Sequence, residues 1–113
     1  MLLTQSAVSL AADIKAKKIS SRAVVEVHIA QVKCVNPRLN AVVFDRFADA
    51  LREADAADAL IASTTDTESL PPLLGVPCTI KDTLEFTGMP QVVGMVSRRD
   101  VYGQKDCYAV AAL

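Results

Sequence analysis

The stretch "LLGVPCTIKDTLEFTGMP", residues 73–90, decides the fold. It is apolar and rich in β-forming residues as far as Ile80, and it becomes charged at Lys81 and Asp82. A nearly continuous apolar run is typical of a strand that is covered on both faces, which needs a sheet with layers on either side. We therefore predict a buried strand over Gly75–Ile80 within an α/β fold, with a lysine where the strand ends.

Two helices are expected at the start of the chain. Apolar residues at helical spacing predict the first over about Ser6–Lys17. The second begins at Ser20 or Ser21, either of which is a suitable N-cap, and it runs to about Val35. The short turn between them predicts a helical hairpin.

The rest of the chain alternates between expected helices and extended segments. Asn36 is suited to the left-handed turn that ends the second helix, and Pro37 is expected to stop it. Five further elements are expected: a strand over Leu39–Phe44, a helix over Phe47–Ser63, a loop over Thr64–Pro72, an extended piece over Val92–Val96 and a last helix with Asp106 as its N-cap.

The composition indicates part of a larger protein. The chain has 113 residues, of which 51% are hydrophobic, and its mean hydropathy is +0.29. Because small domains expose much of their surface, this apolar content predicts faces that other polypeptide covers. The last expected helix also reaches Leu113 without a cap or a breaker. We interpret the chain as the N-terminal fragment of a larger α/β protein.

Charge and hydropathy exclude several classes of protein. A formal net charge of −1 offers no basic face for nucleic acid. The longest uncharged runs are about 12 residues, whereas a membrane span takes roughly 20. The N-terminus lacks the basic region of a signal peptide. We expect an intracellular, cytoplasmic protein, and peripheral membrane association or an anchor before Met1 stays open.

The cysteines do not form a metal or disulfide pattern. Cys34, Cys78 and Cys107 are odd in number and widely spaced, and the chain has a single histidine. We expect three reduced and mostly buried thiols. No metal site and no cofactor are expected.

Lys81 has two interpretations. The pattern alone favours a lysine that snorkels, or pairs with Asp82, at the boundary of an element. The functional interpretation is a general base with a neutral amine, for which apolar surroundings must disfavour the ammonium form by about 4 kcal/mol. An adjacent carboxylate opposes this, but successive side chains of an extended segment point to opposite faces. Lys81 and Asp82 therefore need not meet.

The residues around Lys81 resemble a known family. The run "GVPCTIKD" followed by "TGMP" is similar to the lysine segment of the amidase signature family. The run "KISSRAVVEVHIAQVKCVNPRLNAVV" resembles that family's N-terminal helical hairpin, and "ALREADAADAL" resembles the helix before the lysine strand. The run "GMPQVVGMVSRRDVYGQKDCYAVAAL" is most similar to the fatty-acid amide hydrolase 2 branch. The resemblance covers essentially the whole chain in order and favours the functional interpretation of Lys81.

The resemblance implies a fold and an activity. The implied fold is α/β, with a mixed central sheet between helices and a helical hairpin at its start. The implied activity is hydrolysis of a small-molecule amide with a fatty or other hydrophobic acyl chain, through a Ser–cis-Ser–Lys triad. Lys81 alone matches a triad position, and its implied role is to take a proton from the bridging serine, which deprotonates the nucleophilic serine. A homodimer stays open.

Two departures limit the resemblance. The family's serines lie in a Gly/Ser-rich segment downstream, and no Gly-Gly or Ser-Ser-Gly cluster follows Lys81. Residues 1–113 are thus expected to be the N-terminal portion of one amidase domain, inactive without the remainder, and Ser97 is no substitute. The run "QVVGM" (Gln91–Met95) also lacks the Thr and Ser residues of many bacterial relatives, which weighs against the tRNA-amidating branch.

Two other functions stay open. The first is a non-catalytic, truncated protein that binds a partner through an uncovered apolar face. The second is the A-subunit of a tRNA-dependent amidotransferase, which works in a complex on aminoacylated tRNA. Sequence continuing into a Gly/Ser-rich segment favours the enzyme over the first, and copurification with partner subunits favours the second.

The remaining conspicuous residues have structural interpretations. His28 lies within the valine stripe of the second helix and is expected to pack there. Ser97–Asp100 is expected to be a solvated or salt-bridged loop, with an anion contact as the alternative. Met89 and Met95 either line an acyl channel or pack in the core. Three acidic residues lack metal-ligand order and are expected at the solvated surface: Asp55, Asp58 and Asp66.

Overall fold

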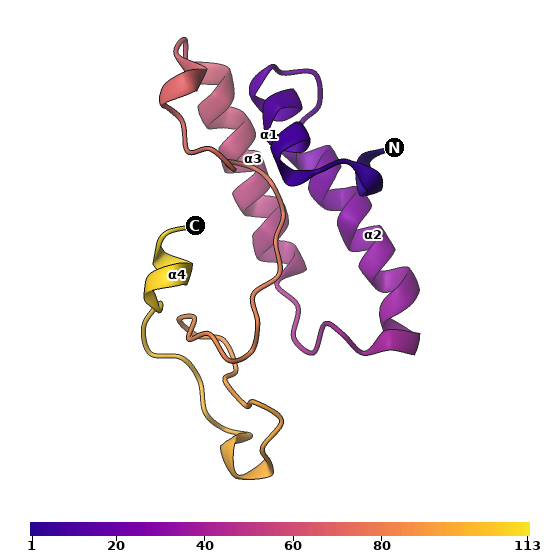
Figure 1. Ribbon diagram of the computed structural model, residues 1–113, viewed down its shortest axis with the longest axis vertical. Helices are drawn as coiled ribbons and strands as arrows, with labels where there is room; N and C mark the ends of the chain where they lie inside the picture. The colour runs from indigo at the N-terminus through magenta and orange to yellow at the C-terminus, as the bar shows by residue number, and fades with distance from the viewer. The chain divides into compact units, whose positions relative to one another are not determined.

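The computed structural model describes residues 1–113, and the chain divides into two compact units, Met1–Pro77 and Cys78–Leu113. We call them the N-terminal unit and the C-terminal unit (Figure 1). The elements, in order, are the 3-10 turn η1 (Leu2–Thr4), α1 (Ala7–Lys15), α2 (Ser21–Leu39), α3 (Phe47–Ser63), the 3-10 turns η2 (Thr67–Ser69) and η3 (Val96–Arg98), and α4 (Tyr108–Ala111).

The first two helices begin where their N-caps predict. The Ser6 side chain accepts a hydrogen bond from the Ser9 N–H at the start of α1. The Ser20 side chain does the same for the Ala23 N–H at the start of α2. These bonds satisfy backbone donors that have no partner within the helix. The two expected helices follow each other as predicted, but the extensive helix pairing is that of α2 with α3 and not a hairpin of α1 on α2.

The end of α2 differs from the prediction. Pro37 lies inside the last turn of the helix and does not stop it. The left-handed C-cap is Asn40, with φ of 48°, and its N–H donates to the Asn36 carbonyl. The side chain of Asn36 both donates to and accepts from the backbone of Val42, at 2.9 Å each. Asn36 therefore fixes the chain beyond the helix. The left-handed turn that was predicted at Asn36 is made by Asn40.

The core of the N-terminal unit joins all three helices. Its buried members are Leu10 and Ile14 of α1, Val24 of α2 and Ile61 of α3. The chain after α3 returns across the helices, and Leu70, Leu74 and Val76 pack against this cluster. In Figure 1, α3 runs antiparallel to α2, with the returning segment beside them. The core therefore holds the segment that leads toward Lys81.

Asp58 of α3 caps the amino terminus of α2. Its carboxylate accepts hydrogen bonds from the N–H groups of Ser21 at 2.7 Å and Arg22 at 3.0 Å. A carboxylate at this position satisfies orphan donors and also opposes the positive end of the helix dipole. Asp58 was expected at the solvated surface, and that expectation is wrong because the side chain is partly buried in this contact.

Ser21 connects the same junction to the returning segment. Its side chain is fully buried, and its hydroxyl donates to the Gly75 carbonyl at 2.7 Å. Gly75 has φ of 81°, and a Cβ there would lie 2.9 Å from the Ser21 Cβ and Oγ. Both the backbone angle and the close approach therefore require glycine at position 75.

No strand forms in either unit. Gly75–Ile80, predicted as a doubly covered strand, is a turn followed by unpaired backbone, with Cys78 and Thr79 exposed. Leu39–Phe44 and Val92–Val96 also have no strand pairing. Extended backbone becomes a strand only when its N–H and C=O groups form a ladder of hydrogen bonds with a neighbouring strand. None of these segments has such a neighbouring strand. The α/β sheet therefore stays a prediction, and the structure is mostly helical.

Large apolar side chains remain uncovered in both units. Val8 is 75% exposed in α1, and Val96 and Tyr108 are 81% and 92% exposed in the C-terminal unit. Exposed apolar side chains occur singly on most protein surfaces. The exposed side chains here agree with the high apolar content of the sequence.

We expect Asp58→Ala to destabilise the protein more than Asp55→Ala. Loss of Asp58 leaves two partly buried N–H groups without acceptors, which costs about 1–3 kcal/mol. Asp55 makes only an exposed ion pair with Arg22 at 2.6 Å, and such pairs contribute about 0–1 kcal/mol. Urea unfolding followed by circular dichroism measures both, and equal losses would contradict the capping role.

Candidate functional site

Lys81 lies in the C-terminal unit with an exposed side chain that has no hydrogen bond or ion pair within the chain. Its backbone carbonyl accepts a hydrogen bond from the Leu84 N–H at 2.8 Å, which closes a turn directly after it. The apolar wall expected from Gly75–Ile80 is incomplete here, because Cys78 and Thr79 are exposed. The backbone of Lys81 is thus held by a hydrogen bond, while its side-chain amine has no partner within the chain.

The Asp82 side chain binds the backbone of a turn about ten residues further along the chain. Its Oδ1 accepts from the Val92 N–H at 3.0 Å, and its Oδ2 accepts from the Val93 N–H at 2.6 Å. Both carboxylate oxygens are therefore used, and neither contacts Lys81. The expectation that the two neighbours need not meet is confirmed.

The turn held by Asp82 has unusual backbone geometry. Val93 has φ of 54°, and Gly94 follows with φ of 70°. A positive φ is common for glycine but exceptional for a β-branched residue, because its Cβ crowds the backbone. Something must hold Val93 in this conformation, and its hydrogen bond to Asp82 does so.

Two stretches of the C-terminal unit, residues 85–91 and 101–107, hold each other by hydrogen bonds. The Gly103 backbone accepts from the Gly88 N–H and donates to the Met89 carbonyl, both at 2.9 Å. The Gln91 N–H donates to the Val101 carbonyl at 2.9 Å. A Cβ at Gly103 would collide with the Phe86 carbonyl. The loop of residues 92–100, which contains the turn bound by Asp82, is therefore closed at its base by a pairing that only glycine allows at position 103.

Asp106 has a different role from the predicted one. It was expected as the N-cap of the last helix, but α4 begins after Cys107 without a side-chain cap. The Asp106 carboxylate instead accepts from both the N–H and the hydroxyl of Thr87, at 2.8 and 2.7 Å. This acid therefore joins the two paired stretches.

The arginines near Ser97 are used within their own loop. Arg98 donates to the backbone and side-chain oxygens of Gln91, at 3.1 and 3.2 Å. Arg99 pairs with Asp100 at 3.3 Å at the exposed surface. The salt-bridged interpretation of this loop is confirmed. Ser97 itself is exposed within η3 and lies in no catalytic arrangement.

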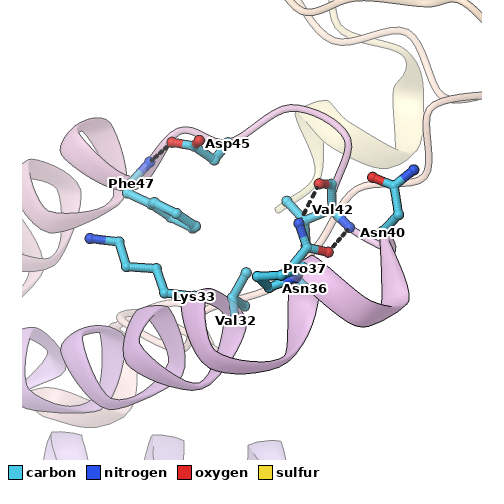
Figure 2. A pocket seen from close by; sticks show the side chains of 8 residues that line it. All are labelled: Val32, Lys33, Asn36, Pro37, Asn40, Val42, Asp45 and Phe47. Carbon is cyan, nitrogen blue, oxygen red and sulfur yellow. Dashed lines mark hydrogen bonds between the residues drawn. The ribbon is translucent and has the colours of Figure 1, made fainter.

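The N-terminal unit has a shallow pocket of about 380 Å³ between the end of α2 and the start of α3. Figure 2 shows Lys33 extending toward the Phe47 ring, with a distance of 5.5 Å from its amine to the ring centroid. On the other side of the pocket, Asn36 binds the backbone of Val42. Lys33 thus contacts the start of α3, and Asn36 holds the connecting segment. None of the predicted site residues lines the pocket.

His28 packs as predicted, whereas the cysteines are more exposed than predicted. His28 is partly buried, and its Nδ1 donates to the Val24 carbonyl at 2.8 Å, so the packing interpretation is confirmed. All three cysteines are free. The expectation that they are mostly buried is wrong, because Cys34 and Cys78 are exposed and Cys107 is partly exposed.

The two other acids of the surface group lie where expected. Asp55 is exposed and pairs with Arg22, while Asp66 accepts from the Glu68 N–H at the start of η2. The hydrogen bond that Arg22 donates to the Glu26 carboxylate, together with the negative charge of Asp55, raises the pKa of Arg22. These contacts form a surface charge network around the start of α2.

Neither a metal cluster nor a membrane helix is present in residues 1–113. No group of three or more His, Cys, Asp or Glu side chains is gathered in space. None of the helices combines the length and the apolar character needed to cross a bilayer.

Comparison with known proteins gives a consistent set of relatives. The sequence model of the Amidase family matches residues 23–113. The chain is 42% identical over 116 residues to fatty-acid amide hydrolase 2-A of Danio rerio, which covers 99% of this chain and 22% of the relative. It is 40% identical over 108 residues to indoleacetamide hydrolase of Bradyrhizobium diazoefficiens (96% and 20%). It is 37% identical over 93 residues to the A-subunit of glutamyl-tRNA(Gln) amidotransferase from Acidothermus cellulolyticus (82% and 18%).

These shares also measure the extent of the chain. It spans about a fifth of the length of the curated relatives it matches, from 18% to 22%.

We expect Gly103→Ala to open the base of the loop formed by residues 92–100. The new Cβ would collide with the Phe86 carbonyl, so the paired stretches must separate. Amide hydrogen exchange at Gln91, which donates to Val101, should become at least about tenfold faster. Lys105→Ala is the control, because Lys105 lies in the same stretch as Gly103 with an exposed side chain. Equal exchange at Gln91 in both variants would contradict the steric argument.

Proposed function

The chain belongs to the amidase family, and we propose that the protein it forms hydrolyses amides with hydrophobic acyl chains. In this proposal the chain supplies Lys81, the lysine of a Ser–cis-Ser–Lys triad. The two serines and the groups that stabilise the oxyanion come from polypeptide outside residues 1–113. The remainder of the amidase domain is therefore required, and this chain alone is inactive.

Lys81 acts as a proton relay in the proposed mechanism. A neutral amine accepts the proton of the bridging serine, while that serine takes the proton of the nucleophilic serine. The nucleophile then attacks the amide carbonyl and forms an acyl-enzyme as the amine departs. The same relay run in reverse protonates the leaving amine, and water later cleaves the acyl-enzyme.

The observation that carries this proposal is the state of Lys81 and Asp82. An amine that is already in an ion pair is a poor proton acceptor, because a nearby anion favours the ammonium form. The nearest carboxylate in sequence is bound to two backbone N–H groups, and the Lys81 side chain has no partner. The chain therefore presents a lysine available for a partner supplied by other polypeptide.

The substrate class is proposed from the relatives. Of these, the fatty-acid amide hydrolase 2-A matches 99% of the chain, whereas the amidotransferase A-subunit matches 82%. Exposed Met95 and partly buried Met89 lie in the segment after the lysine, and methionine adapts to flexible acyl chains. These features favour a hydrophobic amide over an aminoacylated tRNA.

We expect Lys81→Ala to lower kcat for amide hydrolysis by at least about 100-fold in the complete protein, because general acid–base groups contribute about 10²–10⁴-fold. The matched control is Lys105→Ala, since Lys105 is another exposed lysine of the same unit. Steady-state release of ammonia from a fatty-acid primary amide measures the rate. Hydrolysis that persists at the wild-type rate in Lys81→Ala would refute the assignment.

We expect the isolated 113-residue chain to hydrolyse none of three amides: a fatty-acid primary amide, indoleacetamide and glutamine. The complete protein should prefer the fatty-acid amide. Liquid chromatography of the acid products measures both. Turnover by the isolated chain that disappears in Lys81→Ala would show that the chain needs no further residues, contrary to the proposal.

A further inference from the structure

We propose that Asp82 is the positioning residue for Lys81, acting through the backbone and not by contact with substrate. This inference rests on the proposed function, because it needs Lys81 to take part in the reaction. Asp82 fixes the peptide segment that carries the lysine to the turn at Val92–Gly94. It thereby positions the backbone from which the Lys81 side chain extends. Its negative charge is bound by backbone N–H groups and not by the lysine.

The geometry at Asp82 is that of an anchor. Two successive N–H groups, those of Val92 and Val93, converge on one carboxylate, at 3.0 and 2.6 Å. Successive backbone donors of this kind form a concave anion site, and hydrogen bonds to a charged acceptor are stronger than those between neutral groups. The bond from Val92 is partly buried, which reduces competition from water there, whereas the bond from Val93 is exposed.

The anchor acts on Lys81 because two contacts hold the backbone at its carboxyl side. Its own carbonyl accepts from the Leu84 N–H at 2.8 Å. The residue that follows it is held by two bonds to the distant turn. The backbone at Lys81 therefore has little freedom, whereas its side chain has no partner within the chain. Reacting groups lose rate steeply when displaced, and a shift of 1 Å can cost about 100-fold.

The strained turn is the second observation that points to Asp82. Val93 has φ of 54°, which is unfavourable for a β-branched residue. Such a conformation persists only where surrounding structure imposes it, and the Val93 N–H makes its 2.6 Å hydrogen bond to Asp82. Without the carboxylate, the turn is free to relax to negative φ, and the link to the lysine segment is lost.

The test uses the complete protein with Asp82→Ala and Asp82→Asn. Alanine removes both acceptors. Asparagine keeps the size of the side chain but has one carbonyl oxygen, so its NH₂ group faces one of the two N–H donors. We expect kcat to fall about 10–100-fold in Asp82→Ala and less in Asp82→Asn, with KM within about twofold. Amide exchange at Val92 and Val93 should accelerate in both variants.

The matched control is Asp106→Ala. Asp106 also accepts two hydrogen bonds within the C-terminal unit, but it is remote from Lys81 in sequence. We expect kcat of this variant to stay within about threefold of the wild-type value. A loss equal to that of Asp82→Ala would overturn the proposal, because general loosening of the loop would then explain both.

A double variant separates positioning from stability. If Asp82 acts through Lys81, adding Asp82→Ala to Lys81→Ala should change kcat by less than about twofold. A further fall equal to that in the wild-type background would overturn the positioning role. Wild-type activity in Lys81→Ala would instead refute the proposed function, and this inference with it.

Discussion

The amino terminus of α2 depends on acceptors from outside the helix. The first N–H groups of any helix lack partners within it, and here Asp58 of α3 accepts from both Ser21 and Arg22. Because Ser21 also donates to Gly75, one junction joins α2, α3 and the segment that returns across the core. This polar contact at the edge of the apolar cluster therefore links three segments of the N-terminal unit.

Local signals predicted the helices well because the cause of a helix is local. Ser6 and Ser20 cap α1 and α2 as their positions suggest, and Phe47–Ser63 is helical over the predicted range. The end of α2 was harder to predict. Pro37 lies within the helix, and the left-handed turn that ends the helix is at Asn40, three residues later. Strands failed for a different reason. Gly75–Ile80 has the composition of a strand, but a ladder needs a second strand, and none of the other segments supplies one.

The site was predicted in part. The change from apolar to charged residues in "GVPCTIKD" draws attention to Lys81, but only the resemblance of this run to the amidase lysine segment gives the residue its proposed role. The attachment of Asp82 to Val92 and Val93 could not be predicted. It joins residues ten apart across an irregular loop, and no periodic pattern records such a contact. The role of Asp106 was missed similarly: its position before α4 suggested a cap, whereas its acceptor atoms are used by Thr87 nineteen residues earlier in the chain.

The exposed thiol of Cys78 offers a chemical probe of assembly. It lies three residues before Lys81 and is open to reagents in this structure. A maleimide would therefore alkylate it readily wherever the lysine segment stays uncovered, and slowly once other polypeptide closes over that segment. The alkylation rate at Cys78, measured over time and compared with that of Cys34 on α2, therefore reports when the lysine segment becomes enclosed during folding.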